Sequence, residues 1–325
     1  MHKLKNFFRL YVIFFIFFIF VLSGCNSYLG QDKVQKVGML VENSINDQTW
    51  GNKGYKGLIE IKDEFDVDVY FKENVKTQQE VNRAVEEFSN QGVNLIFGHS
   101  NIYGKMFESI SDAYPDIHFV YFNGGYYNTN LTSLNFSSHA MGFFGGMVAG
   151  EMTESNQVGI IAAFEWQPEI EGFYEGVNYS NPEAKVRMNF VNDWDNQERA
   201  RMMFNQMNQR GVDVFYPAGD SFSVHVIDQA KQADKYVIGF VSDQLYLGQN
   251  TVLTSTVQHV DKLYLLAAKK FNEGDLSGGV FTFDFDDGVI SMGEFSPEVP
   301  ESLKEKLDEA VQAYIDTGLL PNESN

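Results

Sequence analysis

Cysteine is nearly absent from this sequence, since Cys25 is the only one among 325 residues. A single thiol excludes an internal disulfide, and it excludes zinc and iron–sulfur sites built from several cysteines. Basic residues are also scarce: 24 lysines and arginines stand against 44 aspartates and glutamates, a formal net charge of -20. An acidic surface repels phosphate backbones, so we expect no direct binding to nucleic acid.

The motifs of common enzymes are missing as well. The sequence holds no G-x-S-x-G elbow, no phosphate loop ending in Gly-Lys-Ser or Gly-Lys-Thr, no G-x-G-x-x-G and no H-E-x-x-H. The six histidines are scattered, and only His99 is a candidate for a site. Asp284, Asp286 and Asp287 faintly resemble a calcium loop, but the downstream glutamate is missing and Asp287-Gly288 favours a hairpin turn. We predict no enzyme, no metal and no cofactor.

The N-terminal segment has the pattern of a bacterial lipoprotein signal peptide. Basic residues precede an uninterrupted apolar run over residues 10–22, which is shorter than the ~20 residues that a membrane-spanning helix needs. The run ends at Leu22-Ser23-Gly24-Cys25, which resembles the lipobox, where the cysteine is diacylated and the preceding peptide is removed. The alternative is an uncleaved anchor helix, and both interpretations place the rest of the chain outside the cytoplasm.

The chain after this segment alternates short apolar runs with amphipathic stretches. Residues 37–41, 67–71, 93–97 and 118–122 read as buried strands, with helices between them, and the alternation restarts after Thr132. Two such series predict an α/β protein with two doubly wound parallel-sheet lobes. Near the C-terminus, residues 280–285 and 289–292 flank Asp287-Gly288 and predict a hairpin.

These patterns divide the chain into predicted parts. The signal peptide covers residues 1–24, and the lipid anchor and tether cover residues 25–35. The N-terminal lobe takes residues 36–134 and 257–280, and the C-terminal lobe takes residues 135–256 and 281–318. Residues 319–325 form a tail.

Candidate ligand contacts come from the carboxyl ends of the predicted strands, because ligands bind there in open α/β sheets. Trp50 and Trp166 have a packing role as the alternative, and Asp47 has helix capping as the alternative. For Asp220 and Asp243 capping is the preferred interpretation. The residues predicted to line the site are Asn46, Asp47, Trp50, His99, Asn123, Phe164, Trp166 and Gly219.

Several segments resemble one known family. They include Val37-Gly38-Met39, residues 46–50 and 54–58, Tyr114-Pro115-Asp116, Gly142-Phe143-Phe144-Gly145-Gly146, Ser242-Asp243-Gln244 and Leu253-Thr254-Ser255. The sequence resembles the basic membrane protein family, the PnrA-like purine-nucleoside-binding lipoproteins of ABC transporters. The resemblance implies a periplasmic-binding-protein-like (type I) fold with a hinge, a small-molecule ligand and an ABC permease as partner.

The resemblance also implies which residues would hold a nucleoside, and this sequence departs from the family at three of those positions. The family has an aspartate and a lysine for the ribose and a further aspartate for the base, where this sequence has Val241, Gln258 and Asn123. We therefore expect Gln258 and Asn123 in the site, and a ligand that is a purine nucleoside or another small polar molecule. Residues 43–58 and Tyr216-Pro217-Ala218-Gly219-Asp220 are similar to a family member that positively regulates competence. The alternative function is such a regulator, with a degenerate site and an indirect effect on transcription.

Overall fold

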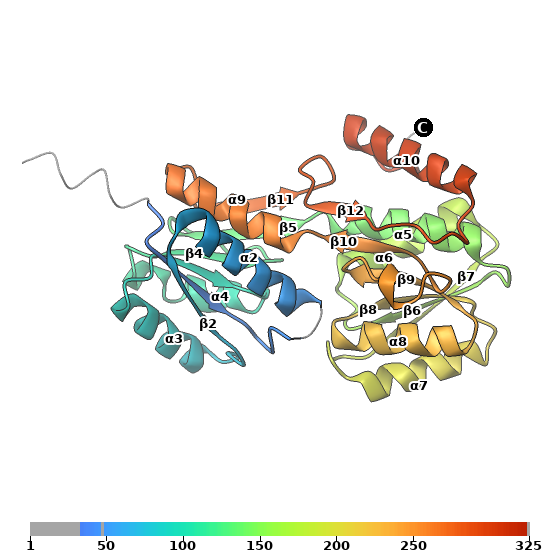
Figure 1. The fold of residues 1–325 in the computed structure, drawn as a ribbon, viewed down its shortest axis with the longest axis horizontal. Helices are drawn as coiled ribbons and strands as arrows, with labels where there is room; N and C mark the ends of the chain where they lie inside the picture. Colours follow the sequence, from blue (N-terminus) through green and yellow to red (C-terminus); the bar gives the residue numbers. More distant parts are fainter. Residues whose placement is uncertain (1–32, 47–48, 324–325) are drawn as a thin grey trace, which may run out of the picture.

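The chain folds into two lobes that lie side by side (Figure 1). The computed structural model describes residues 33–46 and 49–323. The first lobe contains β1 (Lys36–Leu40), α2 (Trp50–Phe65), β2 (Asp68–Lys72), α3 (Gln78–Asn90), β3 (Leu95–Gly98), α4 (Tyr103–Glu108), η1 (Ser111–Ala113), β4 (His118–Phe122), β5 (Leu131–Phe136), α9 (Val260–Glu273) and β11 (Gly279–Phe283). The second lobe contains α5 (Ser138–Met152), β6 (Gln157–Ala162), α6 (Pro168–Ser180), β7 (Lys185–Phe190), α7 (Gln197–Asn208), β8 (Val214–Ala218), α8 (Ser221–Gln232), β9 (Tyr236–Val241), η2 (Leu245–Leu247), β10 (Val252–Gln258), β12 (Ile290–Met292) and α10 (Glu301–Thr317).

Each lobe is built on one six-stranded sheet. The strand order is β11-β5-β4-β3-β1-β2 in the first sheet and β12-β10-β9-β8-β6-β7 in the second. The strands of the first sheet are all parallel, and in the second sheet only β12 is antiparallel to its neighbour. Helices cover both faces of each sheet (Figure 1). The predicted fold class is confirmed, and it is the type I periplasmic-binding-protein architecture.

Local sequence explains these elements. Every residue of β3 and β4 is buried, as expected for central strands covered on both faces. In α3, Val81, Val85 and Phe88 recur at helical spacing on the buried face. The helix begins with a capping box, in which Thr77 and Glu80 each accept a hydrogen bond from the other's backbone N–H.

Helices α5 and α6 pack with their backbones in direct contact. Gly142, Gly146 and Gly150 recur every fourth residue on α5 and face Gly172 and Gly176 on α6. A Cβ atom added to Gly146 would lie 2.1 Å from the carbonyl oxygen of Phe173, and one added to Gly176 would lie 1.9 Å from that of Phe143. No side chain has room there, so glycine is required at this crossing.

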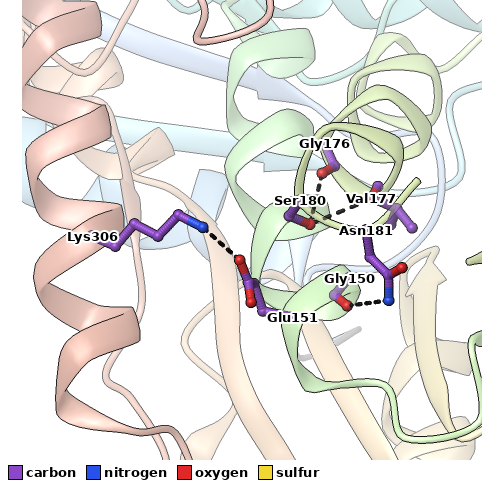
Figure 2. A network of polar contacts seen from close by, with 7 residues as sticks. All are labelled: Gly150, Glu151, Gly176, Val177, Ser180, Asn181 and Lys306. Carbon is purple, nitrogen blue, oxygen red and sulfur yellow. Dashed lines mark hydrogen bonds and ion pairs between the residues drawn. The ribbon is translucent and has the colours of Figure 1, made fainter. Parts of the chain in front are cut away.

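Polar contacts fix the C-terminal ends of the two helices (Figure 2). The hydroxyl of Ser180 donates to the carbonyl oxygen of Gly176 at 3.1 Å, and the amide of Asn181 donates to that of Gly150 at 3.0 Å. Lys306 of α10 reaches across to Glu151 of α5 at 2.5 Å. Three helices of the second lobe are therefore held on one face of its sheet.

The predicted hairpin near the C-terminus is wrong. Asp287-Gly288 does form a turn, since the N–H of Gly288 donates to Phe285 and Gly288 has a φ of 65°. The strands on either side do not pair with each other, because β11 adds to β5 of the first sheet and β12 adds to β10 of the second. The sequence predicted the turn correctly, but it did not predict the pairing, because β11 and β12 lie at the edges of different sheets (Figure 1).

The described chain crosses between the lobes three times, after β5, β10 and β11. These strands end at residues 136, 258 and 283, whereas the predicted lobe boundaries fall after residues 134, 256 and 280. The last difference places residues 281–283 in the first sheet rather than in the C-terminal lobe.

The predicted signal peptide, Cys25 and most of the tether lie outside the described residues. Over residues 33–46 and 49–323, no helix is long and apolar enough to cross a membrane.

The α5–α6 contact generates a stability prediction. Gly146→Ala gains helix propensity but forces a methyl group into the backbone of α6, so we expect the free energy of unfolding to fall by about 1–3 kcal/mol. Urea denaturation of the chain from Asn26 onward measures the change. Gly125→Ala is the control, because a Cβ atom at Gly125 meets nothing within 4 Å. Equal stability of the two variants would contradict the packing argument.

Candidate ligand-binding site

A cavity of about 410 Å³ lies between the two lobes. The first lobe contributes residues that follow the carboxyl ends of its strands, among them Glu42, Trp50, His99, Ser100 and Asn123. The second lobe contributes Trp166, Gln167, Glu169, Trp194, Asp220 and Val241. Because both lobes line it, the cavity is positioned where a ligand would hold them together.

Trp50 and His99 form a stacked pair in the wall of the first lobe. Their ring centroids are 4.6 Å apart and their planes differ by 14°. The indole N–H of Trp50 donates to the carbonyl oxygen of His99 at 3.2 Å, and Nε2 of His99 lies 2.7 Å from the carbonyl oxygen of Trp50. The hydroxyl of Tyr264, on α9, lies 3.0 Å from Nδ1 of His99. The imidazole of His99 thus links Trp50, at the start of α2, to the end of β3 and to α9.

These contacts define the protonation state of His99. A carbonyl oxygen can only accept, so Nε2 carries the proton and Nδ1 accepts from Tyr264. Burial lowers the pKa of His99 to about 4, and the hydrogen bond to the carbonyl oxygen of Trp50 opposes that shift. His99 is therefore neutral at physiological pH, and it supports the wall without adding charge.

Aromatic side chains also build the wall of the second lobe. Trp166 is 54% exposed and stacks on Phe164 with centroids 5.5 Å apart, and Trp194 packs edge-on against both rings. Phe164 lies behind the two tryptophans and does not line the cavity. Trp166 and Trp194 are the members of this cluster that line the cavity.

The predicted site residues have different outcomes in the structure. Trp50, His99, Asn123, Trp166 and Gln258 line the cavity. Three other predicted residues lie elsewhere or outside the described part of the chain: Phe164 supports Trp166, Asn46 is exposed away from the cavity, and Asp47 is not among the described residues.

Gly219 was also predicted to contact the ligand, and it does not line the cavity. It is buried beside the ring of Phe222, with its would-be Cβ 2.0 Å from that ring, whereas the next residue, Asp220, does line the cavity. Glycine is needed at this position for close packing against α8. The strand end was located correctly, but the residue was one position off.

Several lining residues were not predicted from the sequence. Glu42 follows β1, Trp194 follows β7, and Gln167 and Glu169 open α6. Gln167 is 2% exposed and its side chain accepts from the N–H of Phe164 and donates to Glu169. The strand-end rule that found Trp166 could have found Trp194, which follows a strand in the same lobe.

Val241 lines the cavity in a strained backbone conformation. Its φ is 61°, and the N–H of Ser242 donates to the carbonyl oxygen of Phe240 across it at 2.7 Å. This tight turn is rare for a β-branched residue, which avoids positive φ. Strain of this kind occurs where a site fixes the backbone, and here it occurs at a residue of the cavity wall.

Two polar contacts join the lobes around the cavity. Nδ2 of Asn43, after β1, donates to Asp195 of the second lobe at 3.2 Å. Nζ of Lys53, on α2, donates to the carbonyl oxygen of Gln258 at the end of β10, at 2.7 Å. Burial lowers the pKa of Lys53 to about 8, and the nearby Asp261 opposes that shift. The side chain of Gln258 donates to Ser138 at 3.2 Å.

A two-lobed parallel α/β chain with a cavity between its lobes is the arrangement of solute-binding proteins, and comparisons with known proteins give the family. The profile of the PnrA-like ABC transporter substrate-binding proteins matches residues 34–324. The chain belongs to this family of solute-binding proteins.

Individual relatives support the same assignment. The chain is 46% identical to the transcriptional activator protein med of Bacillus subtilis (strain 168), over 96% of this chain and 98% of that protein. It is 25% identical to basic membrane protein D of Borreliella burgdorferi (strain JD1), over 84% of this chain and 82% of that protein. The predicted likeness to the basic membrane protein family and to a regulatory member is confirmed.

Solved structures agree with the fold. A crystal structure of a transcriptional activator of the comK gene from Bacillus halodurans has a TM-score of 0.82 and 46% identity, covering 88% of this chain and 99% of that one. A solute-binding protein of an ABC transporter system from Conexibacter woesei has a TM-score of 0.72 and 16% identity, covering 89% and 99% of the two chains. The second likeness concerns the fold alone.

The buried histidines generate a prediction on pH. His99 and His118 both have a pKa lowered by burial from the usual 6.5 to about 4, so the unfolded chain binds more protons between these values. Stability contributed by each neutral ring is present above about pH 6.5 and is lost as the pH falls toward 4. In urea titrations, His99→Gln should reduce the slope of unfolding free energy against pH by about one proton. An equal slope in the variant would contradict the neutral assignment, and His118→Gln provides a second, independent comparison.

Proposed function

We propose that this protein is an extracytoplasmic solute receptor, held on the outer face of the cell membrane by a lipid on Cys25. The observation that carries the proposal is the cavity, which both lobes line with indole faces, amides and hydroxyls. Its volume of about 410 Å³ suits a small organic molecule, since such sites usually measure about 300–1,000 Å³. Ligand binding would stabilise the closed arrangement of the lobes.

We propose a purine nucleoside, or another small polar molecule with a planar ring, as the ligand. The family supports a nucleoside, and Trp50 and Trp166 offer aromatic surfaces from opposite lobes. Asn123 and Gln258 bring amides to positions where the family has charged side chains. Val241 accepts no hydrogen bond, so a ribose hydroxyl at that wall would lose a charged partner, at a cost of about 1.5–3 kcal/mol. A nucleoside should therefore bind more weakly than in a typical family member.

An ABC permease is the partner that the family suggests for transport. The second candidate function is regulation of competence, as for the relatives described as transcriptional activators. The apolar Val241 in the cavity wall favours it, because it departs from the nucleoside-binding pattern. A net charge of -20 indicates that any effect on transcription is indirect. A permease gene beside this one would support transport, and a competence defect on deletion would support regulation.

Calorimetry tests the ligand. The chain from Asn26 onward should release or take up heat with adenosine, guanosine or inosine, and Trp50→Ala should weaken binding by about 1–3 kcal/mol through lost stacking. Tyr246→Ala is the matched control, because Tyr246 is a 70% exposed aromatic residue outside the cavity. No binding at millimolar concentration would remove these nucleosides as ligands, and equal affinity of the two variants would remove Trp50 from the site.

Labelling tests the anchor. The full chain expressed in a Gram-positive host should incorporate radioactive palmitate and sediment with membranes. Cys25→Ser removes the only thiol in the chain and should abolish the label. Label retained in this variant, or an unlabelled wild-type chain in the cytosol, would contradict the anchor.

A further inference from the structure

Two carboxylates from opposite lobes line the same cavity. Glu169 lies in the first turn of α6 and is 5% exposed, and Glu42 follows β1 and is half-buried. Over residues 33–46 and 49–323, no lysine, arginine or histidine lies within 4.0 Å of either carboxylate as an ion-pair partner. A buried carboxylate without a cation is energetically costly, so Glu169 is the group that a bound positive charge would stabilise most.

The protein compensates Glu169 only in part. Its Oε1 accepts a hydrogen bond from the side chain of Gln167 at 2.9 Å. Its place at the start of α6 adds the partial positive charge of a helix N-terminus, which amounts to roughly half a unit charge. Burial nevertheless raises the pKa of Glu169 above its usual value, so the net environment disfavours the charged form.

The rest of the lining supplies no positive charge. Glu42 accepts a hydrogen bond from the hydroxyl of Ser100 at 2.9 Å, which is a neutral donor. Asp220 adds a third carboxylate to the wall. No lysine or arginine is among the described residues that line the cavity, and His99 is neutral. A phosphorylated or carboxylated ligand would therefore meet repulsion here.

The aromatic side chains that line the cavity also favour a positively charged ligand. Trp50, Trp166 and Trp194 all line the cavity, and the face of an indole attracts cations more strongly than the other aromatic rings do. The net charge of -20 would also draw cations toward the cleft from solution.

We propose that the ligand of this cavity is an organic cation, whose positive charge lies between Glu169 and Glu42 and against the indole faces. This inference rests on the proposed function and specifies the charge of the ligand. A purine nucleoside that carries a positive charge on its base would agree both with the ligand class of the proposed function and with the inferred charge. The ligand would supply the counter-charge that the two carboxylates lack within the protein.

Two sets of matched probes test the charge. The first set is adenosine, its cationic analogue 1-methyladenosine and its anionic 5′-monophosphate. The second is choline and its neutral isostere 3,3-dimethyl-1-butanol. Calorimetry and thermal shift on the chain from Asn26 onward should show the cation of at least one set binding about tenfold more tightly than its neutral partner, with no binding of the monophosphate.

Substitution locates the preference. Glu169→Gln should reduce the ratio of cation to neutral affinity about tenfold, because it removes one charged hydrogen-bond acceptor and keeps the shape. Without ligand, the same variant should melt at a higher temperature near neutral pH, since it removes the free-energy cost of holding an ionisable carboxyl in a buried site that raises its pKa. Glu171→Gln is the matched control, because Glu171 lies on the same helix, is exposed and does not line the cavity.

The outcomes separate the two proposals. If neutral adenosine binds as well as the cations, or if Glu169→Gln and Glu171→Gln change the ratio equally, the inference is overturned and the solute receptor stands. If no probe of either set binds, neither the nucleoside receptor nor its charge preference survives. Tight binding of the monophosphate would overturn the inference outright.

Discussion

The backbone contact between α5 and α6 is the constraint on which the second lobe's side of the cavity depends. Both helices begin at the cavity, with Ser138 at the start of α5 and Glu169 in the first turn of α6. Because carbonyl oxygens of one helix lie where side chains of the other would be, the helices cannot slide or rotate without a clash. The contact begins at Glu169 itself, since a Cβ atom added to Gly142 would lie 2.2 Å from the carbonyl oxygen of Glu169, so the glycines of α5 and α6 set the position of this residue.

In the first lobe, the position of the cavity residue Trp50 is fixed by side-chain contacts rather than by a contact between helix backbones. Trp50 is held by His99, which follows β3, and His99 is in turn held by Tyr264 of α9. Helix α9 belongs to the part of the chain that returns from the second lobe. Lys53 adds a link from α2 to the end of β10. Trp50 is thus fixed by residues that lie far apart in the sequence, and α9 directly follows the crossing between the lobes after β10.

The fold was largely predictable from the sequence, because alternating buried runs and amphipathic stretches determine a parallel α/β architecture. The strand-end rule also located Trp50, His99, Asn123 and Trp166. It could not distinguish Phe164 from Trp166, since only tertiary packing shows which ring faces the cavity and which supports the other. These errors concern side-chain direction within correctly located loops.

Other features depended on contacts that no local pattern contains. Glu169 looks like an ordinary acidic residue at the start of a helix, which is a common and stabilising position. Its burial is visible only once β6 places α6 against α5 and the second lobe faces the first. The hairpin was wrong for the same reason: a turn sequence specifies a bend, whereas pairing is decided by which sheet edges are available.

The three crossings between the lobes have a consequence for the order in which the molecule can assemble. The outer strand β11 and helix α9 of the first lobe come from a part of the chain that is synthesised only after β10 of the second lobe. The second sheet likewise lacks β12 until β11 has emerged. The first lobe therefore stays incomplete until β6 to β10 of the second lobe have been made, and the second lobe is completed last, so neither lobe can reach its final topology as an N-terminal unit that folds ahead of the rest of the chain.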